Sequence, residues 1–257
     1  MSGTDTRFGG IQQLYGIDGL RRFREAHVCV VGIGGVGSWA VEALARSGIG
    51  SLTLVDLDEI CVSNVNRQIH SLDETIGRAK IDVMAGRVRA INSQCRVSTQ
   101  PQFFSETTAD QLLAPGFNFV LDAIDGVTNK TLLLACCRDR NIPVISCGAA
   151  GGRREATTVR VADLSKVTHD RLLAEVRRRL RKHHHFPEGS QPMSVDCVFS
   201  PEPPIFARED GTTCKTRPEV GAGTRLNCNG GLGSATFVTG TFGFVAAGLI
   251  VGKIAAG

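Results

Sequence analysis

A glycine-rich turn between an expected strand and an expected helix constrains the fold of this chain more than any other feature. An apolar run over 27–31 is typical of a buried strand, and Gly32, Gly34 and Gly37 follow it in G-x-G-x-x-G spacing. Residues 39–47 can then form a helix. The glycines let the backbone turn tightly and approach phosphates closely, and the helix start offers unpaired N–H groups to an anion. This order predicts the first half of a nucleotide-binding βαβ unit.

An acidic residue completes the unit. A second apolar run ends on Asp56, about 20 residues beyond the glycines, where a carboxylate can bond the hydroxyls of a ribose. Strand, glycines, helix and acid together indicate a nucleotide site. They do not say which nucleotide is bound.

The rest of the chain predicts one α/β domain. Strand-like and helix-like runs alternate through the first half, with strands expected at 95–99, 118–124 and 142–147 and helices at 81–91 and 128–140. Such alternation predicts a doubly wound, mostly parallel sheet of Rossmann type, with ligands at the carboxyl ends of the strands. We expect a nucleotide-binding half over 1–150 and a substrate or dimer half over 151–257, which would form an elaboration of the same domain. In that half we expect a half-exposed strand at 155–161, a basic helix at 170–182, a loop at 188–204 and an apolar helix at 235–251.

Composition and cysteine usage narrow the class of protein. A net charge of +4 is too small to indicate nucleic-acid binding by the protein as a whole. The start of the chain is polar and carries no export signal, so reduced thiols and a cytoplasmic location are expected. None of the nine cysteines forms a C-x-x-C pair, which argues against zinc knuckles. We interpret Cys147 as a packed small hydrophobe, and Cys228 as either packed or, less favoured, a reactive thiol.

Polar residues further along the chain indicate the chemistry: Asn64, Arg67, Gln68, Lys80, Asp122 and Asp125. A dehydrogenase rarely needs a cationic pair over its nucleotide. An adenylating enzyme must neutralise a triphosphate and the charge that develops when a carboxylate attacks phosphorus, and Arg67 and Lys80 meet that need. A magnesium ion would need a carboxylate, for which we favour Asp125, because Asp122 can equally cap the next helix. These residues favour ATP over NAD.

The chain resembles the E1-like activating enzymes, the superfamily of the ThiF and MoeB proteins. The matching motifs are 7–8, 32–37, Asp56, 63–68, 77–80 and 122–125, in the family's order. The resemblance implies that Asp56 binds the ribose, that Asn64, Arg67 and Lys80 handle the phosphates, and that Asp125 serves Mg²⁺. It places Gln68 among the nucleotide-binding residues as well. It also implies a homodimer in which Arg7 reaches the nucleotide of the partner subunit, and it leaves open a sulfur-relay protein as a further partner.

Segments in the second half narrow the resemblance to one branch of the superfamily. Residues 196–200, 225–231 and 239–243 resemble the tRNA threonylcarbamoyladenosine dehydratases. The resemblance implies that ATP activates the carboxylate of the threonyl group on a modified adenosine near the anticodon. Attack from within the same modification then closes a ring and releases AMP. Because that nucleophile is already tethered, proximity does much of the work and no enzyme nucleophile is required.

The basic helix is the expected contact with tRNA. Arg177, Arg178, Arg179, Arg181 and Lys182 lie in a run with few acids, and cations in such a run bind phosphates, although many such runs are only solvated helix faces. The three histidines at 183–185 point apart on a helix, so we do not favour a metal site there.

Three other functions stay open. The chain could activate the C-terminus of a ubiquitin-like sulfur-carrier protein, act as an NAD-dependent oxidoreductase, or bind ATP without hydrolysing it. For the apolar segment 235–251, a buried or dimer-interface helix is favoured over a membrane-associated tail.

Overall fold

A seven-stranded sheet forms the centre of the computed structural model, which describes residues 6–216 and 232–257. The strand order is β3-β2-β1-β4-β5-β7-β6, and every pairing is parallel except that of β6 with β7. The strands are β1 (His27–Val31), β2 (Ser51–Val55), β3 (Arg96–Gln100), β4 (Phe119–Asp122), β5 (Val144–Cys147), β6 (Arg160–Asp163) and β7 (Asp196–Phe199). A separate hairpin pairs β8 (Phe206–Ala207) with β9 (Thr213–Cys214).

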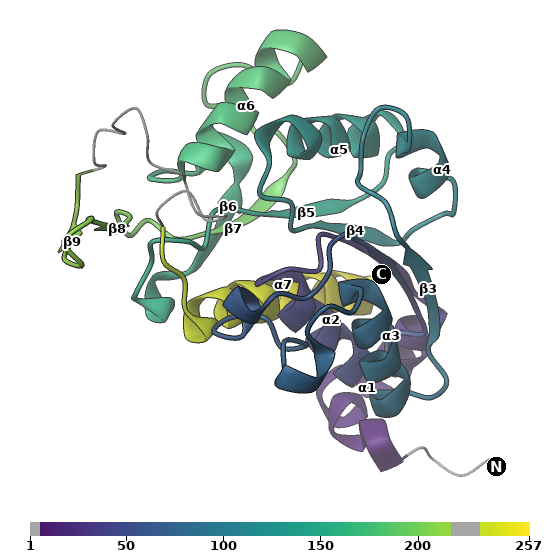
Figure 1. The fold of residues 1–257 in the computed structure, drawn as a ribbon. Coiled ribbons are helices and arrows are strands. Elements are labelled where there is room, and N and C mark those ends of the chain that lie inside the picture. Colours follow the sequence, from purple (N-terminus) through teal and green to yellow (C-terminus); the bar gives the residue numbers. More distant parts are fainter. Residues whose placement is uncertain (1–5, 217–231) are drawn as a thin grey trace.

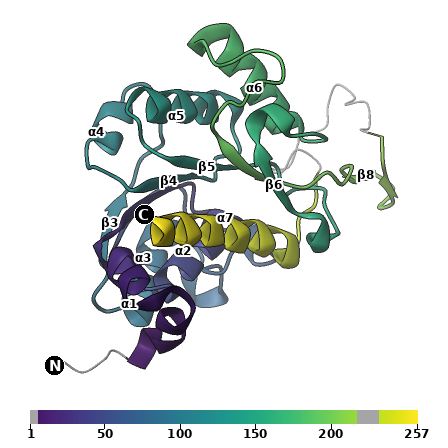
Figure 2. The ribbon, with the colours of Figure 1, turned by 180° about the vertical axis from the view of Figure 1, so that it is seen from behind.

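Helices cover both faces of the sheet, as Figures 1 and 2 show. One face carries α1 (Gly9–Glu25), α2 (Gly37–Arg46), α3 (Lys80–Ile91) and α7 (Thr236–Ala256). The other face carries α4 (Ala109–Leu113), α5 (Val127–Asp139) and α6 (Arg171–His184). Because each parallel crossover passes over a face of the sheet, successive helices bury both sides. The predicted doubly wound, mostly parallel α/β fold is therefore confirmed.

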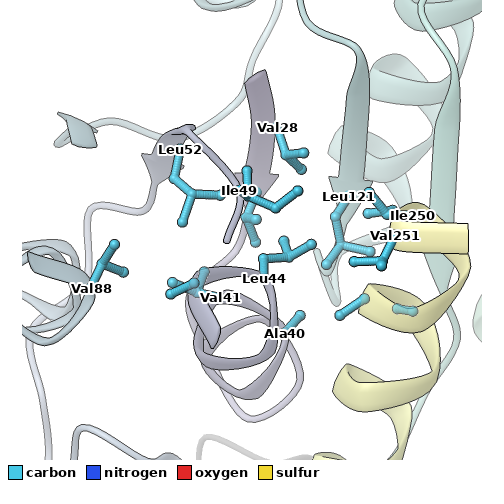
Figure 3. Close-up of a cluster of buried hydrophobic side chains, with 14 of the residues drawn as sticks. Val28, Ala40, Val41, Leu44, Ile49, Leu52, Val88, Leu121, Ile250 and Val251 are labelled. Carbon is cyan, nitrogen blue, oxygen red and sulfur yellow. The ribbon is translucent and has the colours of Figure 1, made fainter. Parts of the chain in front are cut away.

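The main core fixes α2, the helix that follows the glycine turn. Ala40, Val41 and Leu44 lie on one face of α2 and are fully buried against the sheet and against α7 (Figure 3). Their spacing of three and four residues is that of an amphipathic helix. From α7, Ile250 and Val251 reach the same cluster. The start of α2 is thus held rigidly beside the glycine turn.

The apolar C-terminal segment forms α7 and is a core helix. By length and composition alone, with a mean hydropathy of 1.7, it meets the requirements of a membrane span, but half of that window is buried inside the protein. A buried face of ten residues runs from Val238 to Ile254. The prediction of a buried helix is confirmed for this face.

The structure corrects the sequence analysis in the second half. The expected loop at 188–204 contains β7, a buried strand that lies between β5 and β6. Prolines and serines flank its four residues and hide the apolar pattern. The strand expected at 155–161 begins later, at Arg160, after a 3-10 turn over Ala156–Thr158. Helix α1 was not predicted from the sequence. It is kinked at Gly16, where φ is +73°.

Candidate active site

Two of the three glycines are required by the close packing of the turn itself. Gly32 has φ of +93°, and a Cβ there would lie 2.8 Å from the carbonyl oxygen of Ala123. A Cβ on Gly37 would lie 1.8 Å from the carbonyl oxygen of Gly32. A Cβ on Gly34 would meet nothing closer than 3.9 Å, the amide nitrogen of Gln68. The turn is therefore tight at both ends and open at its centre, where a phosphate can approach the backbone.

The peptide groups of Ile33 are held from two sides. Its N–H donates to Asp56 Oδ2 at 2.6 Å, and its carbonyl oxygen accepts from His70 Nε2 at 2.8 Å. Burial raises the pKa of Asp56, and the charge of Lys80 opposes that shift. Burial also lowers the pKa of His70 to about 4, so the imidazole is neutral near pH 7. The sequence analysis missed His70, although it follows the 63–68 motif by only two residues.

Lys80 is a buried cation at the start of α3. It is the first residue of α3, and its side chain is only 7% exposed. Its Nζ donates to Asp58 Oδ2 at 2.7 Å, while the side chain of Asp58 is 53% exposed. Lys80 is thus a buried cation whose partner carboxylate lies near the surface.

The segment between β2 and α3 carries the other expected phosphate ligands. Arg67 is half-buried and donates through Nη1 to the carbonyl oxygen of Ser63 at 2.6 Å and to Asn66 Oδ1 at 3.0 Å. Asn64 is turned into the segment, where its Oδ1 accepts from the N–H of Cys61 at 3.0 Å. Gln68 is buried, and its Oε1 has no hydrogen-bond partner among the described residues. Of Asn64, Arg67 and Gln68, Arg67 is the least buried.

Asp125 and Arg67 face the same region of the site. Burial lowers the pKa of Arg67, and the nearby charge of Asp125 opposes that shift. Asp125 itself is exposed, just beyond the carboxyl end of β4. The side chain of Arg67 lies beside the glycine turn, 3.5 Å from a Cβ built on Gly35, and it interacts electrostatically with Asp125. The roles of both residues toward a nucleotide stay predictions.

Asp122 has a structural role, but it does not cap the next helix as the sequence analysis allowed: the N-cap of α5 is Gly126, with no side-chain cap hydrogen bond. Its carboxylate is fully buried, pairs with Lys130 Nζ at 2.8 Å and accepts from Ser146 Oγ at 2.7 Å. Its Oδ1 also accepts from the N–H of Ile124 at 3.1 Å, and Lys130 donates to the carbonyl oxygen of Ile124 at 2.8 Å. Asp122 thus fixes the turn that carries Asp125. Lys130 was missed, because nothing in an expected helix marks one lysine as buried.

Arg7 lies away from the nucleotide turn of its own chain. Its Nη1 approaches the carbonyl oxygen of Ile91 at 3.5 Å and Ser93 Oγ at 3.3 Å, at the end of α3 opposite to Lys80. Its contact with the nucleotide of a partner subunit stays a prediction.

The basic helix α6 is less open than its sequence suggests. Arg177 turns inward and donates to the carbonyl oxygens of Leu164 and Val167, at 2.8 and 2.9 Å. Arg178 and Arg179 both pair with Glu175, and Arg181 donates to the carbonyl oxygen of Pro187. Within the described part of the chain, Lys182 alone of the five predicted cations has no partner. A concave surface nevertheless lies along this helix and encloses a hollow of about 440 Å³. It is lined by Ala174, Arg177, Arg178, Arg181, Lys182 and Glu188.

Most of the cysteines in the described part of the chain are buried. Cys147 is buried at the end of β5, and burial raises the pKa of its thiol to about 12, so the reading as a packed hydrophobe is confirmed. Cys228 lies outside the described residues, as does the 225–231 motif. Over 6–216 and 232–257 no group of three or more metal-binding side chains comes together.

Comparison with known families agrees with this geometry. The model of the ThiF family matches residues 10–253, which is nearly the whole chain. The chain belongs to the ThiF family. The membership predicted from the motifs between residues 7 and 125 is therefore confirmed.

Its relatives within the ThiF family include tRNA threonylcarbamoyladenosine dehydratases. The Escherichia coli enzyme of that name is 47% identical over 241 residues, covering 93% of this chain and 90% of the relative. A solved structure named TcdA (CsdL) has a TM-score of 0.90 at 45% identity, over 98% of this chain and 96% of that one. The E. coli dehydratase TcdA in complex with ATP has a TM-score of 0.84 at 43% identity, with the same two coverages. The predicted resemblance to this branch is confirmed.

Proposed function

We propose that this ThiF-family chain is an ATP-dependent tRNA threonylcarbamoyladenosine dehydratase. The observation that carries the proposal is 47% identity to a dehydratase of that name along nearly the whole chain, with the ATP complex of such an enzyme superimposing on the same fold. The substrate carboxylate attacks the α-phosphorus of ATP and displaces pyrophosphate. A nucleophile within the same modification then attacks the acyl carbon and displaces AMP, so the modified base loses one water in net terms.

The residues of the sheet edge account for the first step. The open centre of the glycine turn receives phosphate oxygens on backbone N–H groups, and Asp56 holds the ribose. Lys80 and Arg67 neutralise the charge that gathers on the phosphates as pyrophosphate leaves. Both cations are partly withdrawn from water, so their attraction to that charge is stronger than it would be at an exposed surface.

A magnesium ion fits the same edge with Asp125 as its protein ligand. Mg²⁺ is usually bound through one or two carboxylates together with substrate phosphates, and Asp125 is an exposed carboxylate beside Arg67. Asp122 does not fit, because Lys130, Ser146 and the Ile124 N–H already occupy its oxygens. When bound, the ion would polarise phosphate oxygens of ATP.

The same proposal includes a tRNA-binding surface, a homodimer and a cellular location. The concave surface of α6 contacts tRNA phosphates, chiefly through Arg178, Arg181 and Lys182, since Arg177 is turned inward. Two chains form a homodimer in which Arg7 reaches the nucleotide of the partner subunit. The enzyme acts in the cytoplasm, where its tRNA is found.

Matched variants test the proposal. Lys80→Met and Arg67→Ala should fold but lose about 100-fold or more of the rate of AMP formation on tRNA that carries the modification. Lys166→Met and Arg89→Ala, at exposed positions, should keep the parent rate. Full activity in either site variant would show that the phosphate site is assigned wrongly. Pyrophosphate exchange that requires a small carrier protein instead of tRNA would favour the sulfur-carrier function.

A further inference from the structure

A tryptophan holds the backbone at Arg67, through the carbonyl oxygen of the peptide that joins Arg67 to Gln68. Trp39, on α2, donates its indole N–H to the carbonyl oxygen of Arg67 at 2.9 Å. The hydroxyl of Thr239 lies 3.3 Å from the same oxygen, but it is equally close to two carbonyl oxygens of its own helix. The indole N–H bonds only Arg67 among the described residues. The contact with Trp39 is therefore the directional one.

The indole ring is itself fixed in a slot between α2 and α7. A Cβ on Gly243 would lie 2.9 Å from the Cβ of Trp39, so α7 can pass this closely only with glycine there. A Cβ on Gly240 would lie 3.7 Å from the ring. The ring of Phe244 packs edge-on against the indole, with centroids 5.7 Å apart. These contacts place the indole against α7, and the hydrogen bond to the carbonyl oxygen of Arg67 sets the direction of its N–H.

The start of α7 holds the neighbouring residue in the same way. Asn66 Nδ2 donates to the carbonyl oxygen of Ser234 at 2.7 Å, and its own carbonyl oxygen accepts from the hydroxyl of Thr236. The guanidinium of Arg67 in turn donates to Asn66 Oδ1 and to the carbonyl oxygen of Ser63. Both of these acceptors belong to one short segment, and that segment also forms hydrogen bonds with α2 and with the start of α7.

We propose that Trp39 is a positioning residue for Arg67: its indole N–H fixes the Arg67 peptide and so sets where the guanidinium meets the phosphates of ATP. This inference rests on the proposed role of Arg67 as a phosphate ligand. It assigns to Trp39 a second role beside packing against α7, and this role depends on the indole N–H.

A double-mutant cycle tests the inference. Trp39→Phe keeps an aromatic ring in the slot but removes the N–H, while Phe244→Leu weakens the packing of the ring and leaves the N–H in place. Loss of one such hydrogen bond should lower kcat for AMP formation by about two- to tenfold, with the KM for tRNA unchanged. Phe244→Leu should keep the parent kcat. In an Arg67→Ala background, Trp39→Phe should produce no further loss.

Each other result overturns the inference. If Trp39→Phe lowers kcat by the same factor with and without Arg67, the tryptophan acts independently of the arginine, and the phosphate role of Arg67 still stands. If Phe244→Leu lowers kcat as much as Trp39→Phe does, packing and not the N–H is responsible. If Arg67→Ala is itself fully active, the proposed phosphate site fails together with the inference.

Discussion

Replacing Lys130 by methionine should destabilise the protein strongly, because it leaves a buried charge without its partner. Both Lys130 and Asp122 are fully buried, with Nζ 2.8 Å from Asp122 Oδ2. Removing one member of such a pair typically costs about 3–5 kcal/mol, against a total free energy of unfolding of about 5–15 kcal/mol. Asp122 keeps its bonds from Ser146 and the Ile124 N–H, which favours the lower end of that range. We therefore expect a loss of about 3 kcal/mol.

Urea unfolding at fixed protein concentration measures this loss. The chain contains one tryptophan, the half-buried Trp39, whose fluorescence can report the transition. Lys166→Met, at an exposed position, serves as the matched control and should unfold within about 0.5 kcal/mol of the parent. The double variant Lys130→Met/Asp122→Asn carries neither charge and should recover part of the loss. Equal stability of Lys130→Met and Lys166→Met would refute the reasoning.

Three further predictions follow from the site. Gly37→Ala should destabilise the protein by about 1–3 kcal/mol or more in urea unfolding, because the added Cβ would clash with the carbonyl oxygen of Gly32. Gly34→Ala should keep the parent stability, because a Cβ there has room. Equal effects of the two substitutions would contradict the close packing of the turn. His70 takes up its proton below its ordinary pKa of 6.5 in the unfolded chain but only near about 4 when folded, so the free energy of unfolding should fall by about 3 kcal/mol as the pH drops between these values. His70→Gln should remove that part of the pH dependence, and an unchanged pH profile would show that the imidazole is not buried and neutral. Because Trp39 bonds the Arg67 peptide, ATP should change its fluorescence in the parent but not in Arg67→Ala; an ATP response that survives in Arg67→Ala would show that Arg67 does not carry it.

The glycine turn can be predicted from the sequence because local backbone requirements set it. Gly32 and Gly37 are needed wherever a strand turns this tightly into a helix, so their spacing is visible without a structure. Asp56 is marked by its position at the end of an apolar run. The family resemblance carried the rest of the assignment, since Lys80 and Asp125 have no local pattern of their own.

The parts that the sequence did not predict depend on contacts between distant segments. Strand β7 is buried because β5 and β6 flank it and because core residues of α6 and α7 pack with it. Its four residues are too few to outweigh the prolines and serines around them. Arg177 looks like its neighbours in the sequence, yet it faces the carbonyl oxygens of another segment. Trp39 reaches Arg67 across 28 positions of the chain. Such roles depend on packing between distant segments, and the residue pattern along one helix does not reveal that packing.

Mass analysis of tRNA nucleosides tests the central claim most directly. tRNA that carries threonylcarbamoyladenosine would be incubated with the enzyme, ATP and magnesium, and the nucleosides would then be released and weighed. The account predicts that the modified nucleoside loses the mass of one water and that AMP appears in equal amount, with neither change in Lys80→Met. An unchanged nucleoside in the presence of folded, ATP-binding enzyme would contradict it.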